Sequence, residues 1–230
     1  MAAVKLTRGM HERHGWRSTT VPVSSLKRTA PVPEKIVPFL IFMLAGAITP
    51  GPNNMISTAS GAAFGYARTV PQMLGVALGF PVMILAVGLG LGELLRRAPW
   101  LHEAVRVAGA LFLLYFAWRI ARAAGPEQTE ARKPFTLIEA ALFQWLNPKS
   151  WTFAVGTIAA FTTPGLPFAG FLAETGTIAV LSGALAFASL SVWCLFGVMI
   201  GRLLADERKR RIFQYTLALL LALSIVFLFV

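Results

Sequence analysis

The chain has 230 residues and a formal net charge of +11; 56% of its residues are hydrophobic and only 13% are charged. Soluble domains carry roughly 25% charged residues, and the apolar stretches here reach the roughly 20 residues that a helix needs to cross a bilayer. These features exclude a soluble globular protein. They also exclude a nucleic-acid partner, because the basic residues lie in a tail and in loops that lack interleaved aromatic residues.

Residues 1–33 are polar and basic, with Glu12 as their single acidic residue. They contain no apolar core of the kind that a secretory signal peptide requires. We interpret this segment as a disordered tail outside the folded unit, or as the product of a start codon assigned too far upstream.

The remaining chain predicts an all-α integral membrane protein of about six transmembrane helices. The expected spans are residues 36–63, 70–95, 101–123, 136–161, 169–200 and 212–230. They divide into a first three-helix half (36–124) and a second (134–230), and the second is inverted because three crossings are an odd number. Counting Lys and Arg in the loops places both termini outside, whereas the basic tail argues for the opposite orientation. We expect a multi-pass protein of the cell (inner) membrane.

Prolines interrupt the first and fourth spans near their middles. Pro50 and Pro52 flank Gly51 in the first, and Pro148 breaks the fourth. Proline removes a backbone donor, and unsatisfied backbone at this depth is tolerated only where protein or a cavity satisfies it. Paired interruptions in two halves of a membrane protein indicate a transporter's binding site. The alternative for each proline taken singly is an ordinary helix kink.

The chemistry at these breaks suits a zwitterion. Half-helix N-termini favour a carboxylate, whereas freed carbonyls and amide side chains favour an ammonium group. We therefore predict an amino-acid substrate bound by residues of both breaks: Thr49, Pro50, Gly51, Pro52, Asn53, Asn54, Gln144, Asn147, Pro148 and Lys149.

Lys149 is the only basic residue near the middle of a predicted span, and an intramembrane charge indicates function. It would pair with the substrate carboxylate or lose its proton during transport. Alternatively, it reaches through the break and only supports the fold. Glu139 is a second candidate for coupling, although a glutamate at a helix start more often stabilises the helix end. A buried lysine repels cationic side chains, which favours small neutral amino acids.

Other chemistries find little support in the sequence. No carboxylate lies as deep as Lys149 and Cys194 is the single cysteine, so we predict no metal site and no cofactor. The histidines lie in the tail and at a helix entrance, and neither HExxH nor GxSxG occurs, which argues against an enzyme. An exporter of another small metabolite and a non-transporting structural bundle remain alternatives. Glycines at spacings of four residues are interpreted as helix-packing positions.

The segment from Thr49 to Asn54, followed by Gly61, Gly65, Gly75 and Gly79, resembles the signature of the lysine-exporter (LysE/RhtB) family. The segments 144–149 and 117–119 extend this resemblance over nearly all of residues 36–230. It implies a six-helix amino-acid exporter driven by a gradient of H⁺ or Na⁺, with homo-oligomerisation left open. Residues 52–54 and 78–80 look most like the cysteine and O-acetylserine exporters. Phe80 departs from the polar or acidic residue that members often carry there, so the resemblance supports no acid on the second helix.

Overall fold

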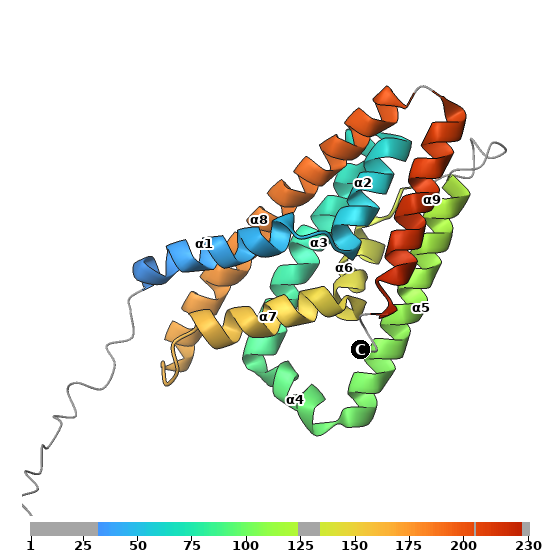
Figure 1. The fold of residues 1–230 in the computed structure, drawn as a ribbon. Coiled ribbons are helices and arrows are strands. Elements are labelled where there is room, and N and C mark those ends of the chain that lie inside the picture. The colour runs from blue at the N-terminus through green and yellow to red at the C-terminus, as the bar shows by residue number, and fades with distance from the viewer. Residues whose placement is uncertain (1–31, 124–133, 205, 227–230) are drawn as a thin grey trace, which may run out of the picture.

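A computed structural model describes residues 32–123, 134–204 and 206–226, and every regular element within these ranges is a helix (Figure 1). Over these residues the predicted all-helical class is confirmed. The tail lies outside them except at its end, because the first helix already begins at Val32. The elements are α1 (Val32–Ile48), α2 (Pro52–Phe64), α3 (Tyr66–Ala86), the π-helical turn η2 (Val87–Leu91), α4 (Gly92–Arg97), α5 (Pro99–Ala123), α6 (Leu137–Leu146), α7 (Pro148–Phe161), α8 (Phe168–Leu203) and α9 (Glu207–Leu223).

The first predicted span is two helices that meet at an angle of 56°. α1 ends at Ile48 and α2 begins at Pro52, as the prolines predict. Pro52 occupies the first turn of α2, where a helix has no use for the missing N–H. Gly51 precedes it with an extended backbone (φ −165°, ψ 174°). The break therefore follows directly from the local sequence.

The fourth predicted span is broken in the same way. Asn147 separates α6 from α7 with a non-helical backbone (φ −93°, ψ 112°), and Pro148 is the first residue of α7. The Asn147 side chain caps α7 by accepting a hydrogen bond from the Lys149 N–H at 3.1 Å. Asparagine is a preferred N-cap because its oxygen satisfies a free amide of the first turn. This residue and the proline together set the position of the break.

The number of membrane spans is only partly as predicted. Within the residues that the structure describes, three helical segments are long and apolar enough to cross a bilayer: Tyr66–Leu94, Glu103–Arg122 and Phe168–Leu203. The bent pair α1–α2 makes a fourth if it is counted as one span. The break in the fourth predicted span leaves helices of 10 and 14 residues. The sixth contains a 17-residue helix that ends at Leu223, and its predicted end at Val230 lies outside the described residues. Each is shorter than the roughly 20 residues of a straight crossing.

The outer surface of the helices is apolar. Val180 and Val192 on α8 are 71% and 68% exposed, and Ile138 on α6 and Ile41 on α1 are exposed as well. Soluble monomers rarely present large continuous apolar surface to water. Side chains of this kind facing outward on several helices indicate that the molecule is surrounded by lipid.

Glycines allow α2 to pack closely against α8, and α3 to pack closely against α6. A Cβ added at Gly61 would lie 2.3 Å from the Cys194 carbonyl oxygen of α8. One added at Gly75 of α3 would lie 2.2 Å from the carbonyl oxygen of Leu137 in α6. Backbones can approach this closely only where the side chain is absent. The predicted packing role of these spaced glycines is confirmed here.

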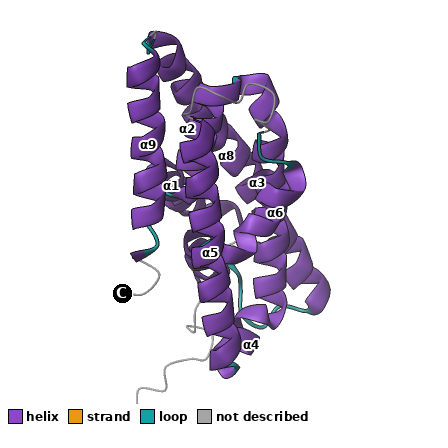
Figure 2. Ribbon diagram, turned by 90° about the vertical axis from the view of Figure 1, so that its right-hand side faces the viewer, coloured by secondary structure: helices purple, strands orange, loops and turns teal. Residues whose placement is uncertain are grey.

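Among the four helices that flank the two breaks, α1 and α7 point in a different direction from α2 and α6. Figure 1 shows both extending away from the side of the molecule where α5 and α9 lie, and Figure 2 shows α5 and α9 adjacent along that side. α1 and α7 contact each other through aromatic rings, with the centroids of Phe42 and Phe153 5.0 Å apart. Aromatic side chains thus contribute to the contact between these two helices.

Candidate functional site

A cavity of about 600 Å³, counted with its open mouth, lies between the two helix breaks. Its walls come from the end of α1, the start of α2, α3, the α6–α7 break and the middle of α8. Among the predicted site residues, those that line it are Gly51, Asn53, Asn54, Gln144, Asn147 and Lys149. The structure therefore brings residues from both breaks, about 90 positions apart in sequence, to one cavity.

The other predicted site residues have different positions. Thr49, Pro50, Pro52 and Pro148 form the backbone of the breaks and are not among the lining residues. Glu139 lies at the start of α6, where it forms a capping box with Thr136. Its carboxylate also pairs with Arg119 of α5 at 2.7 Å. These contacts place Glu139 in the stabilisation of a helix end, apart from the cavity.

An amide network joins the two breaks across the cavity. Asn53 Nδ2 donates to Gln144 Oε1 at 2.9 Å, and the hydroxyl of Ser150 donates to the same oxygen at 2.9 Å. Gln144 Nε2 donates to the carbonyl of Ala140 at 2.8 Å. Gln144 is fully buried, and a buried amide of this kind is stable only when its donors and acceptors are paired. It fixes α2 and α7 relative to each other.

The Ala47 carbonyl at the end of α1 is satisfied by three side chains from two other helices. The carbonyl of Ala47 accepts hydrogen bonds from Asn54 (2.9 Å), Trp193 (3.1 Å) and Ser189 (3.2 Å). The last two residues belong to α8. A helix end leaves carbonyls without partners inside the helix, and here the fold supplies them from α2 and α8. The end of α1 is thereby fixed to the long helix.

Lys149 crosses from the second break to the first. Its ammonium group donates to the carbonyl of Thr49, which also accepts from Asn54 at 3.1 Å. A cation at this position complements the partial negative charge at the C-terminal end of α1. The Lys149 side chain lies over Gly51, because a Cβ added there would be 2.8 Å from its Cδ. A side chain at Gly51 would therefore displace the flexible end of Lys149.

The sequence did not single out the rest of the cavity wall. Ser150 and Phe153 of α7, and Ser189 of α8, line it together with apolar residues of α1, α3 and α8. Phe80, noted only as a departure from the family pattern, is one of them. The hydroxyls of Ser150 and Ser189, inside predominantly apolar helices, were the available signal. None of the described lining residues is acidic.

We expect Gln144→Leu to destabilise the folded protein by roughly 1–3 kcal/mol, because it leaves the Asn53 amide and the Ser150 hydroxyl buried without their acceptor. The measurement is unfolding of the purified protein in a denaturing detergent. Leu142→Ala, at an exposed position on the same helix, is the control and should change stability by about 0.5 kcal/mol or less. Asn53→Leu combined with Gln144→Leu should cost less than the sum of the two. Strict additivity would show that the pair does not interact.

A helical membrane protein with a polar cavity between two interrupted helices has the architecture of a transporter. The chain belongs to the family of LysE type translocators, whose family model matches residues 44–230. The predicted family is therefore confirmed.

Individual relatives agree with this assignment. The chain is 26% identical over 198 residues to the cysteine/O-acetylserine efflux proteins of Escherichia coli (strain K12) and Shigella sonnei (strain Ss046). The alignment covers 86% of this chain and 98% of each relative. No solved structure matches the chain. Family and relatives together identify a multi-pass membrane transporter rather than an enzyme.

Proposed function

We propose that the protein is a secondary active transporter that exports small neutral amino acids across the cytoplasmic (inner) membrane. The observation that carries this proposal is the cavity between the two helix breaks, whose described lining contains amide side chains and an ammonium group but no carboxylate. Its relatives are named for efflux of cysteine and O-acetylserine. Both compounds are small zwitterions with uncharged side chains, which matches the groups that line the cavity.

The lining offers a partner for each end of such a substrate. The Lys149 ammonium and the N-terminal turns of α2 and α7 favour a carboxylate. The side-chain oxygen of Asn53 and, next to the lining, the carbonyl of Thr49 favour an ammonium group. Met43, Phe80 and Phe153 supply an apolar wall for a small side chain. Substrate would compete with Thr49 for Lys149, which makes the lysine a direct contact in the loaded state.

The order of the helices supports two inverted three-helix repeats. Each half begins with an interrupted helix (α1–α2 and α6–α7), continues with the longest helix of that half (α3 with its extension to α4, and α8), and ends with α5 or α9. In this arrangement the two breaks are equivalent positions. Rocking of the halves about the cavity would expose it to one side of the membrane at a time.

The first experiment is efflux from cells preloaded with labelled amino acids. We expect cells that contain the protein to lose cysteine, O-acetylserine or another small neutral amino acid faster than control cells with an empty vector, while labelled lysine and arginine are retained equally. Collapsing the H⁺ and the Na⁺ gradient separately identifies the coupling ion. If no amino acid leaves faster, although membrane insertion is normal, the substrate class is wrong. Export of another metabolite or a purely structural bundle then becomes the better explanation.

A further inference from the structure

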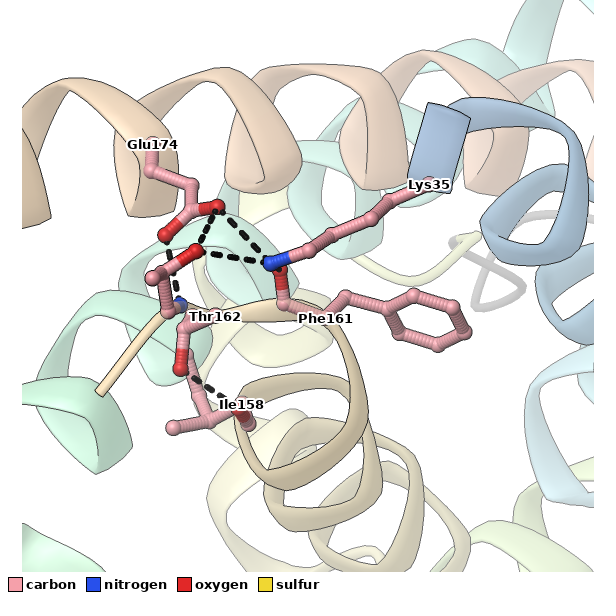
Figure 3. Close-up of polar contacts among 6 residues, drawn as sticks. Lys35, Ile158, Phe161, Thr162 and Glu174 are labelled. Carbon is pink, nitrogen blue, oxygen red and sulfur yellow. Dashed lines mark hydrogen bonds and ion pairs between the residues drawn. The ribbon is translucent and has the colours of Figure 1, made fainter. Parts of the chain in front are cut away.

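A second polar cluster lies outside the cavity, where α1 begins, α7 ends and α8 begins. We call Lys35, Thr163 and Glu174 the latch. Lys35 Nζ lies 3.3 Å from Glu174 Oε1 and donates to Thr163 Oγ1 at 2.7 Å. Figure 3 shows Lys35 and Glu174 meeting beside Phe161, whose carbonyl lies 3.4 Å from the same ammonium group. The latch joins α1 directly to α8 and to the segment that follows α7.

The Glu174 carboxylate is fully engaged by these contacts. Its Oε1 accepts from Lys35 and from the Thr163 hydroxyl (3.0 Å), and its Oε2 accepts from the Thr163 backbone N–H at 2.7 Å. The Glu174 side chain is only 4% exposed and that of Lys35 is 19% exposed. Removing one partner of such a pair leaves a buried charge uncompensated. Loss of any one of the three groups is therefore expected to weaken the contacts of the other two.

An aromatic layer separates the latch from the cavity. Phe42 packs against Phe153 and Phe161, with ring centroids 5.0 and 5.6 Å apart, and Phe39 packs edge-on against Phe161 at 5.5 Å. Along α1, Lys35 lies about 16 Å from the cavity residue Gly46, at the helical rise of about 1.5 Å per residue. A path out of the cavity between α1 and α7 would cross the aromatic layer first and the latch second.

The two ends of the bundle are closed by different kinds of contact. On the side of α2 and α6, glycines bring backbones together, as at Gly61 and Gly75. On the side of α1 and α7, the Phe153 ring lies against Gly46, and the other contacts include aromatic rings and the side chains of the latch. Both helices also connect to their other halves through non-helical residues at Gly51 and Asn147. Such residues can absorb a change of backbone angle in a hinge motion.

We propose that the latch holds α1 and α7 closed over the cavity and must open in each transport cycle to let the substrate through. This inference rests on the proposed transport function. Lys35, Thr163 and Glu174 are thus gating residues, and they do not contact the substrate. Opening separates Lys35 from Glu174, which both line a small space beside Phe39 and Ile178, and thereby widens access to that space.

The first test measures access to that space and does not require transport. Ile178→Cys, in a background where the buried Cys194 is replaced by Ala, is labelled with a water-soluble thiol reagent in lipid nanodiscs. Lys35→Met and Thr163→Val should each raise the labelling rate about tenfold or more, because they shift the closed state toward the open one.

Thr162→Val is the matched control. The Thr162 hydroxyl donates only to the carbonyl of Ile158 within its own helix (2.6 Å; Figure 3), so its labelling rate should equal the parent's. An unchanged rate in both Lys35→Met and Thr163→Val would overturn the latch, whatever the transport assays show. A raised rate in a protein that exports no amino acid would leave the latch standing and contradict the proposed function instead.

A second test separates gating from a fixed structural contact. Lys35→Cys and Thr163→Cys are joined by a short bifunctional thiol reagent. A latch that must open predicts that cross-linking stops efflux and that reductive cleavage restores it. A contact that stays closed throughout the cycle predicts that the cross-linked protein transports as well as the reduced one, and this result would contradict the proposal.

Discussion

Efflux of the amino-acid substrate is expected to fall about 10- to 100-fold in Lys149→Met, since a hydrogen bond to a charged group contributes roughly 1.5–3 kcal/mol. The physical reason is the position of the Lys149 ammonium between the two breaks, where it lines the cavity and bonds to the carbonyl of Thr49. The measurement is the efflux rate at matched amounts of protein in the membrane. Lys209→Met, at an exposed position in the first turn of α9, is the control for loss of one positive charge.

Thermal stability separates the two roles considered for Lys149. If it contacts the substrate, the parent protein is stabilised by added substrate and Lys149→Met is not, because a ligand stabilises the folded state only when it binds to it. If it only supports the break, Lys149→Met loses stability without substrate but keeps the substrate-induced shift. The second pattern would remove Lys149 from the binding site and leave the amide network as its polar part.

The second large effect is expected from Gly197→Ala in α8. A Cβ at this position would lie 2.0 Å from the Thr58 carbonyl oxygen and 2.8 Å from the carbonyl carbon. Both atoms are backbone, so α2 must move away from α8. Overpacking typically costs about 1–3 kcal/mol and occasionally more, and we expect the upper end because no flexible side chain can yield. The yield of folded protein in mild detergent and its melting temperature should both fall.

Gly176→Ala on the same helix is the control for this experiment. A Cβ there has no neighbour within 4 Å. Because a transmembrane segment stays helical in the unfolded state within the bilayer, this substitution should change stability by about 0.5 kcal/mol or less. Equal loss in the two variants would show that helix composition, rather than the contact with Thr58, decides the outcome.

The sequence was most informative where local chemistry decides the structure. Pro52 and Pro148 each begin a helix, and Gly51 and Asn147 adopt the non-helical conformations that precede them. The grouping of Asn53, Gln144 and Lys149 followed from the expectation that the two breaks are equivalent. A proline's effect on its own helix needs no knowledge of the rest of the fold, and this is why these positions were found.

Positions that depend on the pairing of distant helices could not be predicted. α8 is apolar over most of its 36 residues, so its pattern did not show that Ser189 and Trp193 face the end of α1. Glu174 looked like an ordinary glutamate near a helix start, and its partner Lys35 lies 139 residues away. Hydropathy also did not register that the break leaves α6 and α7 as helices of 10 and 14 residues, each too short for a straight crossing.

The hydrogen bonds at Ala47 have a mechanical consequence for α1. They fix the inner end of this helix to Trp193 and Ser189, while the outer end carries Lys35. The two positions are about 18 Å apart along the axis, at about 1.5 Å per residue. A rotation of about 15° around the fixed end would carry the ammonium group about 5 Å, beyond hydrogen-bonding range. α1 is thus a lever with its pivot beside the cavity, and small tilts there become large displacements at its far end.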